Sequence, residues 1–328
     1  MIYACIIIYA KKTIMVLIFT SNEDQSALEV KKWLMTFNEK VLLITPNILA
    51  KESTFYAELG NDYFRLDGEK IEVKNIKSVW YRKWPINKEI SLLSKKKTSE
   101  NNKIETWLKG ELEQLSMFLF NYFEKYKWLC FPDSTRTNKL IQQKIALKIG
   151  LDCPKTFLTT VWKSKKKEYI TKSIENNIMI NFQNCLYTNY TENIIHFEDV
   201  FPSLVQEKIE KEYEVRVFYL NEKCYPMAIF SQSDEQTKTD FRRYNLNKPN
   251  RTVPYQLDDS IKEKIEELMQ KLDLNTGSLD FIRCKKSNKL YFLEVNPQGQ
   301  FGMVSKPCNY HLEKKIAVEL VNMNHGTY

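Results

Sequence analysis

The length and composition of the chain indicate a folded protein of more than one domain. Its 328 residues exceed what one hydrophobic core usually organises, and 43% of them are hydrophobic. The net charge of +8, from 49 basic and 41 acidic side chains, suits an anionic ligand such as a nucleotide or an acidic peptide. No zinc-finger spacing and no ribonucleoprotein aromatic motif is present, so we expect no nucleic-acid partner.

Cysteine and histidine usage excludes several classes of site. The seven cysteines are odd in number, scattered, and never in CxxC spacing. This pattern favours reduced thiols in the cytoplasm and argues against a disulfide framework or a zinc site. The three histidines form no cluster, which argues against a Ser-His-Asp hydrolase or a His-ligated metal enzyme.

The apolar N-terminus, residues 1–12, is too short to span a bilayer and lacks the features of a signal peptide. We therefore expect no membrane partner. Two alternatives stay open for residues 1–14. They are either part of a first strand, or upstream sequence that precedes a true start at Met15.

The first part of the chain reads as an open α/β domain over about residues 1–90. We expect a buried strand at 14–20, an amphipathic helix at 22–39 and a second strand at 41–45. A third strand follows at 78–83. Strands that alternate with a helix in this way are typical of a parallel sheet.

Two helices are expected next. The first covers 103–127 and carries a continuous apolar stripe. The second covers 138–149, with Ser134 and Thr135 as candidate caps and Gly150 at its end. The stripe consists of Ile104, Leu108, Leu112, Leu115, Leu119 and Phe123.

The remaining elements are short strands, two helices and a polar loop. We expect an amphipathic helix at 260–272, built on Ile261, Ile265, Leu268 and Leu272, and a closing helix at 312–322. The polar stretch 232–252 is the best candidate for a mobile loop. The short strands are expected at 157–162, 168–172, 204–208, 213–220 and 224–231.

The most informative segment, residues 275–310, begins with two strands joined by a short polar turn. If the turn is symmetric about Ser287, Asp280 lies directly opposite Glu294. Strand residues alternate between faces, so Leu290, Phe292, Glu294 and Asn296 are expected to share one side. Two carboxylates and an amide oxygen then converge on one spot.

Like charges that face each other in a sheet are destabilising, so we expect a cation between these two carboxylates. Hard oxygen ligands without a nearby His or Cys suit Mg²⁺, which commonly binds through one or two carboxylates and substrate phosphates. The alternative is a hairpin whose acidic face is merely solvated. We favour the metal site because the strand that carries Glu294 is otherwise apolar.

Other residues supply the parts of a nucleotide site. The backbone at 207–209 could pair with a purine edge, and Glu214 could accept ribose hydroxyl groups. Lys139 lies close to a helix N-terminus, a natural anion site, and Lys172 lies on an apolar strand. The alternatives are a charged surface hairpin and ordinary surface lysines. No GxxxxGK[ST] loop and no GxGxxG fingerprint is present, which excludes a P-loop or Rossmann site.

The chain resembles the ATP-grasp superfamily from about residue 131 to residue 321. The motifs that carry the resemblance are NKLIQQKIALKIGLDCPKTFLTT (138–160), VQEKIEKEYEVRVF (205–218), DFRRYN (240–245), SLDF (278–281) and LEVNPQGQF (293–301). Residues 294–317, with WYRK at 80–83, resemble more narrowly the grasp-with-spasm maturases, relatives of the graspetide (microviridin-type) peptide ligases.

The resemblance implies a role for each matching residue. Phosphates of ATP would be bound by Lys139 and Lys172, adenine by Gln206, Glu207, Lys208 and Ile209, ribose by Glu214, Mg²⁺ by Asp280, Glu294 and Asn296, and the transferred phosphoryl group by Arg216 and Arg242. The sequence departs from the family in one region. Ser173, rather than the usual Pro, follows Lys172, and residues 174–190 lack a glycine-rich phosphate loop.

The resemblance also implies a fold and a function. The fold is α/β (α+β), with an N-terminal pre-ATP-grasp domain at 1–125, a central subdomain at 126–204 and a C-terminal subdomain at 205–328. The activity is ATP-dependent ligation of Asp or Glu side chains in a ribosomally made precursor peptide, with leader and core segments, to give esters or amides. The alternatives are another amino-acid ligase of the superfamily and a non-catalytic nucleotide- or peptide-binding protein. Whether the chain forms a homo-oligomer is left open.

Overall fold

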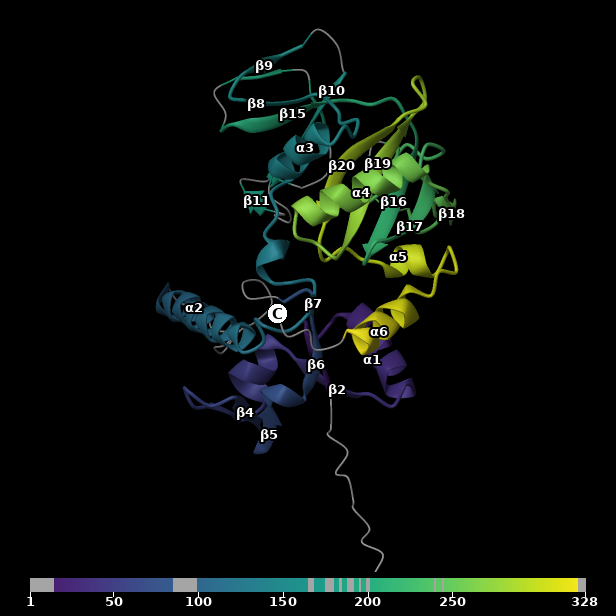
Figure 1. Cartoon of the computed structure of the whole chain (residues 1–328). Coiled ribbons are helices and arrows are strands. Elements are labelled where there is room, and N and C mark those ends of the chain that lie inside the picture. Colours follow the sequence, from purple (N-terminus) through teal and green to yellow (C-terminus); the bar gives the residue numbers. More distant parts are fainter. Residues whose placement is uncertain are drawn as a thin grey trace, which may run out of the picture. The chain divides into compact units, whose positions relative to one another are not determined.

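A computed structural model describes residues 15–84, 99–164, 168–174, 180–182, 185–187, 192–194, 196–198, 201–238, 240–243 and 245–323 (Figure 1). The chain divides into two compact units, Met1–Pro132 with Glu313–Tyr328, and Asp133–Leu312. The predicted boundaries at 125/126 and 204/205 remain predictions. The expectations for residues 1–14 lie outside the described residues.

The first unit contains a parallel sheet with the strand order β2-β1-β6-β7. Its strands are β1 (Met15–Phe19), β2 (Lys40–Ile44), β6 (Ile76–Tyr81) and β7 (Trp128–Leu129), and α1 (Gln25–Thr36) connects β1 to β2. All five residues of β1 are buried, as expected for a central strand of a parallel sheet. The predicted open α/β beginning is therefore confirmed.

A small antiparallel sheet between β2 and β6 was not predicted. It has the order β3-β4-β5, with β3 (Phe55–Ala57), β4 (Tyr63–Leu66) and β5 (Glu69–Glu72). Asp67 and Gly68 join β4 to β5 with φ angles of 48° and 79°. Asp-Gly between two short strands is a typical signal of a two-residue hairpin turn, so the sequence does carry a sign of this element. In the sequence, a short helical segment precedes this sheet at Ile48–Glu52 and another follows it at Val73–Asn75.

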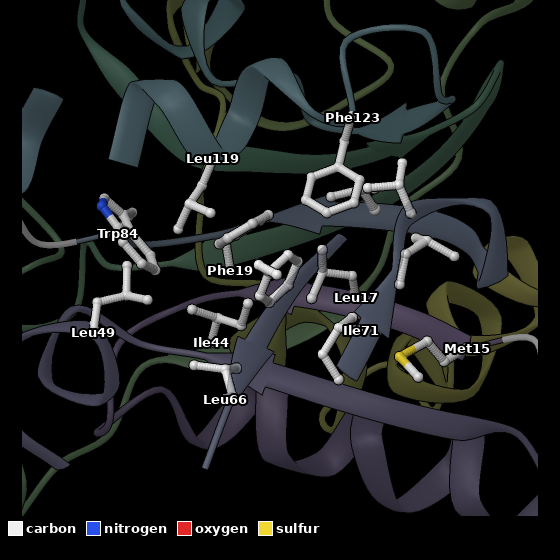
Figure 2. Packing of buried hydrophobic residues seen from close by; sticks show 14 of the residues in the cluster. Met15, Leu17, Phe19, Ile44, Leu49, Leu66, Ile71, Trp84, Leu119 and Phe123 are labelled. Atoms are coloured by element: carbon white, nitrogen blue, oxygen red, sulfur yellow. The ribbon is translucent and has the colours of Figure 1, made fainter. Parts of the chain in front are cut away.

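Aliphatic and aromatic side chains together form the core of the first unit (Figure 2). The ring of Phe19 at the end of β1 contacts those of Trp84, Phe120 and Trp128, with centroids 4.9–6.0 Å apart. Phe120 belongs to α2 (Ser99–Asn121), which begins and ends earlier than the predicted helix 103–127. The contacts with Trp84 and Phe120 are edge-to-face and the contact with Trp128 is stacked, and ring pairs of both kinds stabilise the core beyond the apolar area that they bury.

The last helix, α6 (Leu312–Asn322), lies almost wholly in the first unit. The buried Ser78 hydroxyl on β6 donates to the carbonyl of Leu320 at 2.8 Å, a contact between residues 242 positions apart. The division at 205–328 places this helix with the C-terminal subdomain, whereas the contacts group it with the N-terminal sheet.

The second unit contains a five-stranded antiparallel sheet with the order β18-β17-β16-β19-β20. Its strands are β16 (Lys211–Leu220), β17 (Lys223–Phe230), β18 (Arg251–Pro254), β19 (Thr276–Cys284) and β20 (Leu290–Asn296). β18 was not predicted, since it falls at the end of the polar stretch that we read as a loop. β20 is an edge strand, so only β19 pairs with it in this sheet.

Two helices contribute to the core of this sheet. α4 (Asp259–Lys271) buries Ile265, Leu268 and Met269 against strand residues such as Phe281 and Phe292, as its predicted stripe requires. α3 (Lys139–Lys148) ends at Gly150, whose φ of +81° favours glycine. The predicted caps Ser134 and Thr135 are wrong, because Asn138 caps α3 by accepting from Leu140 N at 2.8 Å.

A smaller sheet of the second unit has the order β13-β10-β15-β8. Its strands are β8 (Thr156–Thr159), β10 (Tyr169–Lys172), β13 (Glu192–Ile194) and β15 (Ser203–Glu207). Residues 174–190, noted above for their missing glycine-rich loop, lie largely outside the described residues. The other elements described are β9 (Trp162–Lys163) paired with β14 (His196–Phe197), β11 (Ile180–Phe182) paired with β12 (Cys185–Tyr187), and α5 (Gly302–Ser305).

Within the described ranges, none of the helices combines the length and the apolarity needed to cross a membrane.

Candidate functional site

A β-bulge in β20 brings the two predicted metal-binding carboxylates together. Near the turn, Phe281 pairs with Phe292, and one step further along β19 Asp280 pairs with Glu294. Leu293 is therefore an extra residue in β20. The predicted pairing of Asp280 with Glu294 is confirmed, although the register before the bulge differs by one residue from the symmetric turn that we assumed.

The bulge corrects the predicted faces of β20. Strict alternation places Leu290, Phe292, Glu294 and Asn296 on one side, and this prediction is wrong. Leu290, Phe292 and Val295 all pack in the core of the sheet, and the spacing of three between the last two marks the bulge. Glu294 instead faces a cavity on the other side.

Each of the two carboxylates has a cationic partner. Glu294 Oε2 lies 3.1 Å from Lys139 Nζ, and Asp280 Oδ1 lies 3.5 Å from Arg216 Nη1. Arg216 is the residue directly opposite Asp280 on β16. The amide nitrogen of Asn296 lies 3.5 Å from an oxygen of each carboxylate. All four charged side chains are at most 15% exposed, so solvent screens their interactions weakly.

The pKa shifts show how these charges interact. Burial alone would raise the pKa of Glu294, but the ammonium groups of Lys172 and Lys139 outweigh it, and the pKa lies below its usual value. Burial raises the pKa of Asp280, and Arg216 only partly opposes this shift. Burial lowers the pKa of Lys172, against the attraction of Glu294. A bound cation would therefore stabilise the charged form of Asp280, and a bound anion would stabilise the charged form of Lys172.

The two lysines come from different elements. Lys139 is the first residue of α3, as predicted, and its Nζ also lies 3.5 Å from the carbonyl oxygen of Ser173. Lys172 is the last residue of β10. Two ammonium groups beside a helix N-terminus form a suitable environment for phosphate groups.

A cavity of about 460 Å³, which we call the central cavity, contains most of the predicted site. Arg216 and Asn296 do not line it, but they contact the carboxylates that do. A volume of this size suits a small-molecule ligand. The predicted residues that line it are Lys139, Lys172, Gln206, Glu207, Lys208, Ile209, Glu214, Arg242, Asp280 and Glu294.

The backbone after β15 offers fewer free groups than expected. The N–H of Glu207 donates to Lys155 O at 2.8 Å, and that of Lys208 donates to Glu168 O at 2.7 Å. Among the described residues, no backbone carbonyl accepts from the N–H of Ile209. Ile209 is therefore the residue whose N–H is best suited to pair with a purine edge.

Gln206 lines the central cavity, and a series of hydrogen bonds fixes the direction of its side-chain amide. Leu293 O can only accept, so the side chain of Gln143 directs its Nε2 to it at 3.1 Å. Gln143 Oε1 then accepts from Thr156 Oγ1 at 2.9 Å, and Thr156 Oγ1 accepts from Gln206 Nε2 at 2.9 Å. These hydrogen bonds leave Gln206 Oε1 as a buried acceptor. Among the described residues it has no hydrogen-bond partner.

Glu214 lies in the cavity between two polar side chains. It forms a short ion pair with Lys211, and Ser231 Oγ donates to its second oxygen at 2.7 Å. Burial raises the pKa of Glu214, and Lys211 opposes this shift. Sequence reasoning missed Lys211, for which the i,i+3 spacing to Glu214 gave only a weak signal.

Arg242 is held by a neighbour that the sequence analysis also missed. Its Nε and Nη2 donate to the two oxygens of Asp240 at 2.9 and 2.6 Å, a bidentate arrangement that orients the guanidinium. These hydrogen bonds raise the pKa of Arg242 further above its ordinary value. The only sign of this pair in the sequence was the spacing of two between Asp240 and Arg242.

Apolar side chains complete the cavity, and sequence reasoning did not single them out. Ile170, Ile282 and Leu293 line it together with Phe281. Flat apolar walls beside a few polar groups suit a planar base. Ile170 lies two residues before Lys172, and Leu293 lies directly before Glu294. Strict alternation would place Leu293 and Glu294 on opposite faces of β20, whereas the bulge lets both line the cavity.

The residues present fit a magnesium ion. Asp280 and Glu294 face each other, and Asn296 carries an amide oxygen as well as the nitrogen that contacts both carboxylates. Two carboxylates and an amide are hard oxygen ligands in the number that Mg²⁺ uses when phosphates complete its coordination. Within the described residues, no group of three or more His, Cys, Asp or Glu side chains gathers.

Comparison with known proteins identifies the family of this chain. A model of the RimK-like ATP-grasp domain matches residues 137–320, more than half of the chain. The chain belongs to the RimK-like ATP-grasp family. It is thus an ATP-grasp ligase, as the motifs predict, and ATP and Mg²⁺ are the cofactors typical of this family. Curated protein sequences give no significant match.

Solved structures with similar folds include two enzymes with bound peptides. The macrocyclase MdnC of Microcystis aeruginosa, bound with precursor peptide MdnA, is 22% identical over 94% of this chain and 99% of its own, with a TM-score of 0.74. The RiPP-associated ATP-grasp ligase of Chryseobacterium gregarium, in complex with ADP and a leader and core peptide, is 23% identical over 95% and 96%, with a TM-score of 0.72. At these identities the similarity confirms the predicted ATP-grasp fold.

A ligase of another kind is less similar. D-alanyl-alanine synthetase A of Vibrio cholerae is 13% identical over 96% of this chain and 99% of its own, with a TM-score of 0.54. The fold of this chain therefore matches the peptide-bound enzymes more closely than this dipeptide-forming one.

Proposed function

We propose that this RimK-like ATP-grasp protein activates Asp or Glu side chains of a ribosomally made precursor peptide and joins them to hydroxyl or amine side chains of the same peptide. The observation that carries the proposal is the convergence of Asp280 and Glu294 beside two lysines in the central cavity. The fold shared with two peptide-bound ligases along nearly the whole chain supports the peptide as substrate.

The site residues divide among the parts of ATP. Lys139 and Lys172 bind phosphates, Glu214 accepts from the ribose hydroxyls, and residues 206–209 contact adenine. Asp280, Glu294 and Asn296 hold Mg²⁺, which when bound offsets the negative charge of the phosphates. Arg216, which pairs with Asp280, and Arg242, which pairs with Asp240, supply positive charge for the transferred phosphoryl group.

The chemistry follows from charge. An oxygen of the peptide carboxylate attacks the γ-phosphorus of ATP, ADP leaves, and an acyl phosphate forms. A hydroxyl or amine then attacks the carbonyl carbon, loses its proton, and displaces phosphate, so one water is lost from the peptide for each bond. The protein supplies positioning and cationic side chains rather than a nucleophile. This fits a chain with three histidines and no nucleophilic dyad predicted from its sequence.

We place this reaction in the cytoplasm, where ATP is made and where cysteines stay reduced. Five cysteines of the described residues are free thiols, which supports a reducing compartment. Oligomeric state remains open.

Intact mass spectrometry tests the proposal. The purified protein is incubated with MgATP and a Thr-, Asp-, Glu- or Lys-rich peptide encoded beside its gene. We expect the peptide to lose one water mass per bond, only when ATP is present. A gain of mass on a peptide or protein would instead indicate an amino-acid ligase. An unchanged peptide without ATP hydrolysis would indicate a binding protein.

A further inference from the structure

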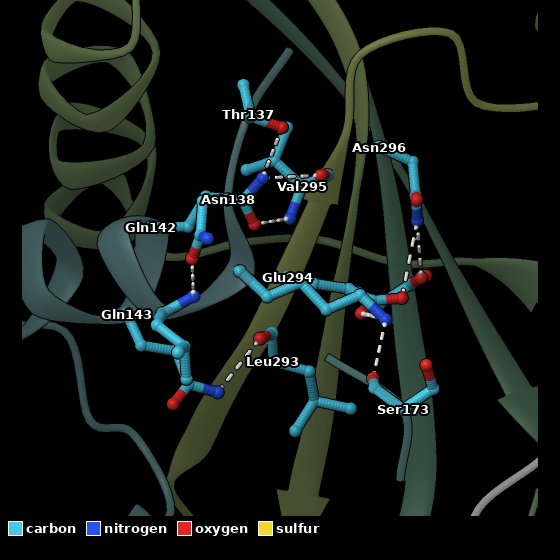
Figure 3. Close-up of polar contacts among 12 residues, drawn as sticks. Thr137, Asn138, Gln142, Gln143, Ser173, Leu293, Glu294, Val295 and Asn296 are labelled. Atoms are coloured by element: carbon cyan, nitrogen blue, oxygen red, sulfur yellow. Dashed lines mark hydrogen bonds and ion pairs between the residues drawn. The ribbon is translucent and has the colours of Figure 1, made fainter. Parts of the chain in front are cut away.

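Partners from α3 and from the segment that follows it cover the outer edge of β20, and Figure 3 shows those from α3, Gln142 and Gln143. Phe292 N donates to Asp152 O at 2.8 Å, and Leu293 O accepts from Gln143 Nε2 at 3.1 Å. Val295 N donates to Gln142 Oε1 and Val295 O accepts from Gln142 Nε2, both at 2.8 Å. One glutamine amide thus makes both hydrogen bonds that a neighbouring strand would make.

The place where this glutamine binds is the residue after the bulge. If β20 had no bulge, the register between Phe281 and Phe292 would continue, and Asp280 would pair with Leu293 instead of Glu294. A shift of one residue in a strand moves side chains to the opposite face. The position of Glu294 in the cavity therefore depends on whatever holds the backbone of β20 at Leu293 and Val295.

The burial and the hydrogen bonds of Gln142 suit a residue that holds the backbone of β20 in place. It is 1% exposed and its Nε2 also donates to Thr137 Oγ1 at 2.8 Å, which fixes the direction of the amide. Val295 is itself 2% exposed, so water cannot replace the lost hydrogen bonds. Buried backbone groups left without partners are costly, and this favours a single arrangement of the bulge.

We propose that Gln142 is a positioning residue of the metal site, which takes the place of an adjacent strand and holds Glu294 opposite Asp280. The proposal rests on the Asp280, Glu294 and Asn296 set as the metal site. It concerns a residue that does not touch the ligand. Residues that support metal ligands from behind typically change metal affinity by roughly 10- to 100-fold when they are replaced.

The test measures metal binding without a peptide, so it is independent of the peptide chemistry. Electron paramagnetic resonance follows the binding of Mn²⁺ to the full chain in the presence of saturating ADP. For Gln142→Met, whose side chain is of similar length but has no hydrogen-bonding amide, we expect the dissociation constant for Mn²⁺ to rise roughly 10-fold. The dissociation constant for ADP measured without metal should change less than about 2-fold.

A matched control separates positioning from general weakening of α3. Asn138→Ala removes the N-cap of the same helix, which typically costs about 1 kcal/mol, and the side chain that it shortens accepts hydrogen bonds from Leu140 N and Ile141 N within α3. We expect it to lower thermal stability while leaving Mn²⁺ binding unchanged. If both variants weaken Mn²⁺ binding equally, or if neither does, Gln142 has no positioning role.

A second variant keeps the proposal testable if Gln142→Met does not fold. Gln142→Glu retains an acceptor for Val295 N but loses the donor to Val295 O and Thr137. We expect an intermediate effect on the dissociation constant for Mn²⁺. Wild-type binding of Mn²⁺ by this variant, with ADP binding also unchanged, would contradict the proposal.

Discussion

Asp280 and Glu294 face each other across β19 and β20 because Leu293 is an extra residue in β20. Because of the bulge, the consecutive residues Leu293 and Glu294 both line the central cavity. One irregularity thus places an apolar side chain beside a carboxylate in the cavity. Bulges next to active sites commonly redirect side chains in this way.

The metal assignment predicts a large effect of Glu294→Gln. The amide retains the shape of the side chain but removes the charge that Lys139 and Lys172 compensate. Because a bound metal supplies several kcal/mol of transition-state stabilisation, we expect kcat for ligation to fall roughly 1,000-fold. Circular dichroism should show an unchanged fold. Turnover like that of the wild type would contradict the metal role.

The ribose assignment predicts that Glu214→Ala weakens ATP binding more than it slows the reaction. A hydrogen bond to a charged group contributes about 1.5–3 kcal/mol, so we expect KM for ATP to rise roughly 10- to 100-fold. The control is Glu212→Ala, an exposed carboxylate two residues away on the same strand. Steady-state kinetics with varied ATP distinguish the two, and an unchanged KM for Glu214→Ala would exclude the ribose role.

The orientation of the Gln206 amide predicts base selectivity. Its free Oε1 can accept from the 6-amino group of adenine, whereas guanine presents an acceptor there. Gln206→Met should lower kcat/KM for ATP by roughly 5-fold, since one hydrogen bond of about 1 kcal/mol is lost. The same variant should leave activity with purine riboside triphosphate, which lacks the amino group, unchanged. An equal loss with both nucleotides would show that the effect is structural.

The shifted pKa of Lys172 predicts a pH-dependent trade-off between stability and function. Removal from water lowers its pKa in the folded state below the value of 10.5 expected when unfolded. Folding therefore disfavours the charged form, and this penalty is present at pH 7 and fades as the pH rises through the folded pKa toward 10.5. We expect Lys172→Met, without nucleotide, to unfold at a higher temperature than the wild type at pH 7.

The difference in unfolding temperature between Lys172→Met and the wild type should narrow as the pH approaches 10.5. The same variant should lose activity if the lysine binds phosphate. Thermal scans at several pH values provide the measurement. A variant that is less stable at pH 7 would show that the attraction between Lys172 and Glu294 outweighs the cost of burying the lysine.

Long periodic elements were predictable from sequence, and elements without a periodic signal were not. The stripe of α4 and the Gly150 end of α3 follow from helical spacing and from glycine at positive φ. β4 and β5 are only four residues each, too short for alternation to show, although Asp67-Gly68 marks their turn. The polar sequence before β18 masked that strand because its pairing with β17 is a tertiary contact.

The chemistry of the site was more predictable than its geometry. Carboxylates and lysines were recognisable because few other roles suit them in apolar segments. The bulge at Leu293 was not, because register depends on partners such as Gln142, whose contact with Val295 spans 153 residues. Gln206 was assigned through resemblance, but the direction of its amide emerges only from the contacts of Thr156 and Gln143.

Transfer of oxygen from the peptide to phosphate tests the central claim most directly. The peptide is prepared with ¹⁸O in its Asp and Glu side-chain carboxyl groups and is incubated with the protein and MgATP. An acyl phosphate intermediate predicts that each released phosphate carries one ¹⁸O and that one phosphate appears for each bond formed. Unlabelled phosphate, released while bonds form, would show that the carboxylate is not phosphorylated and would contradict the account.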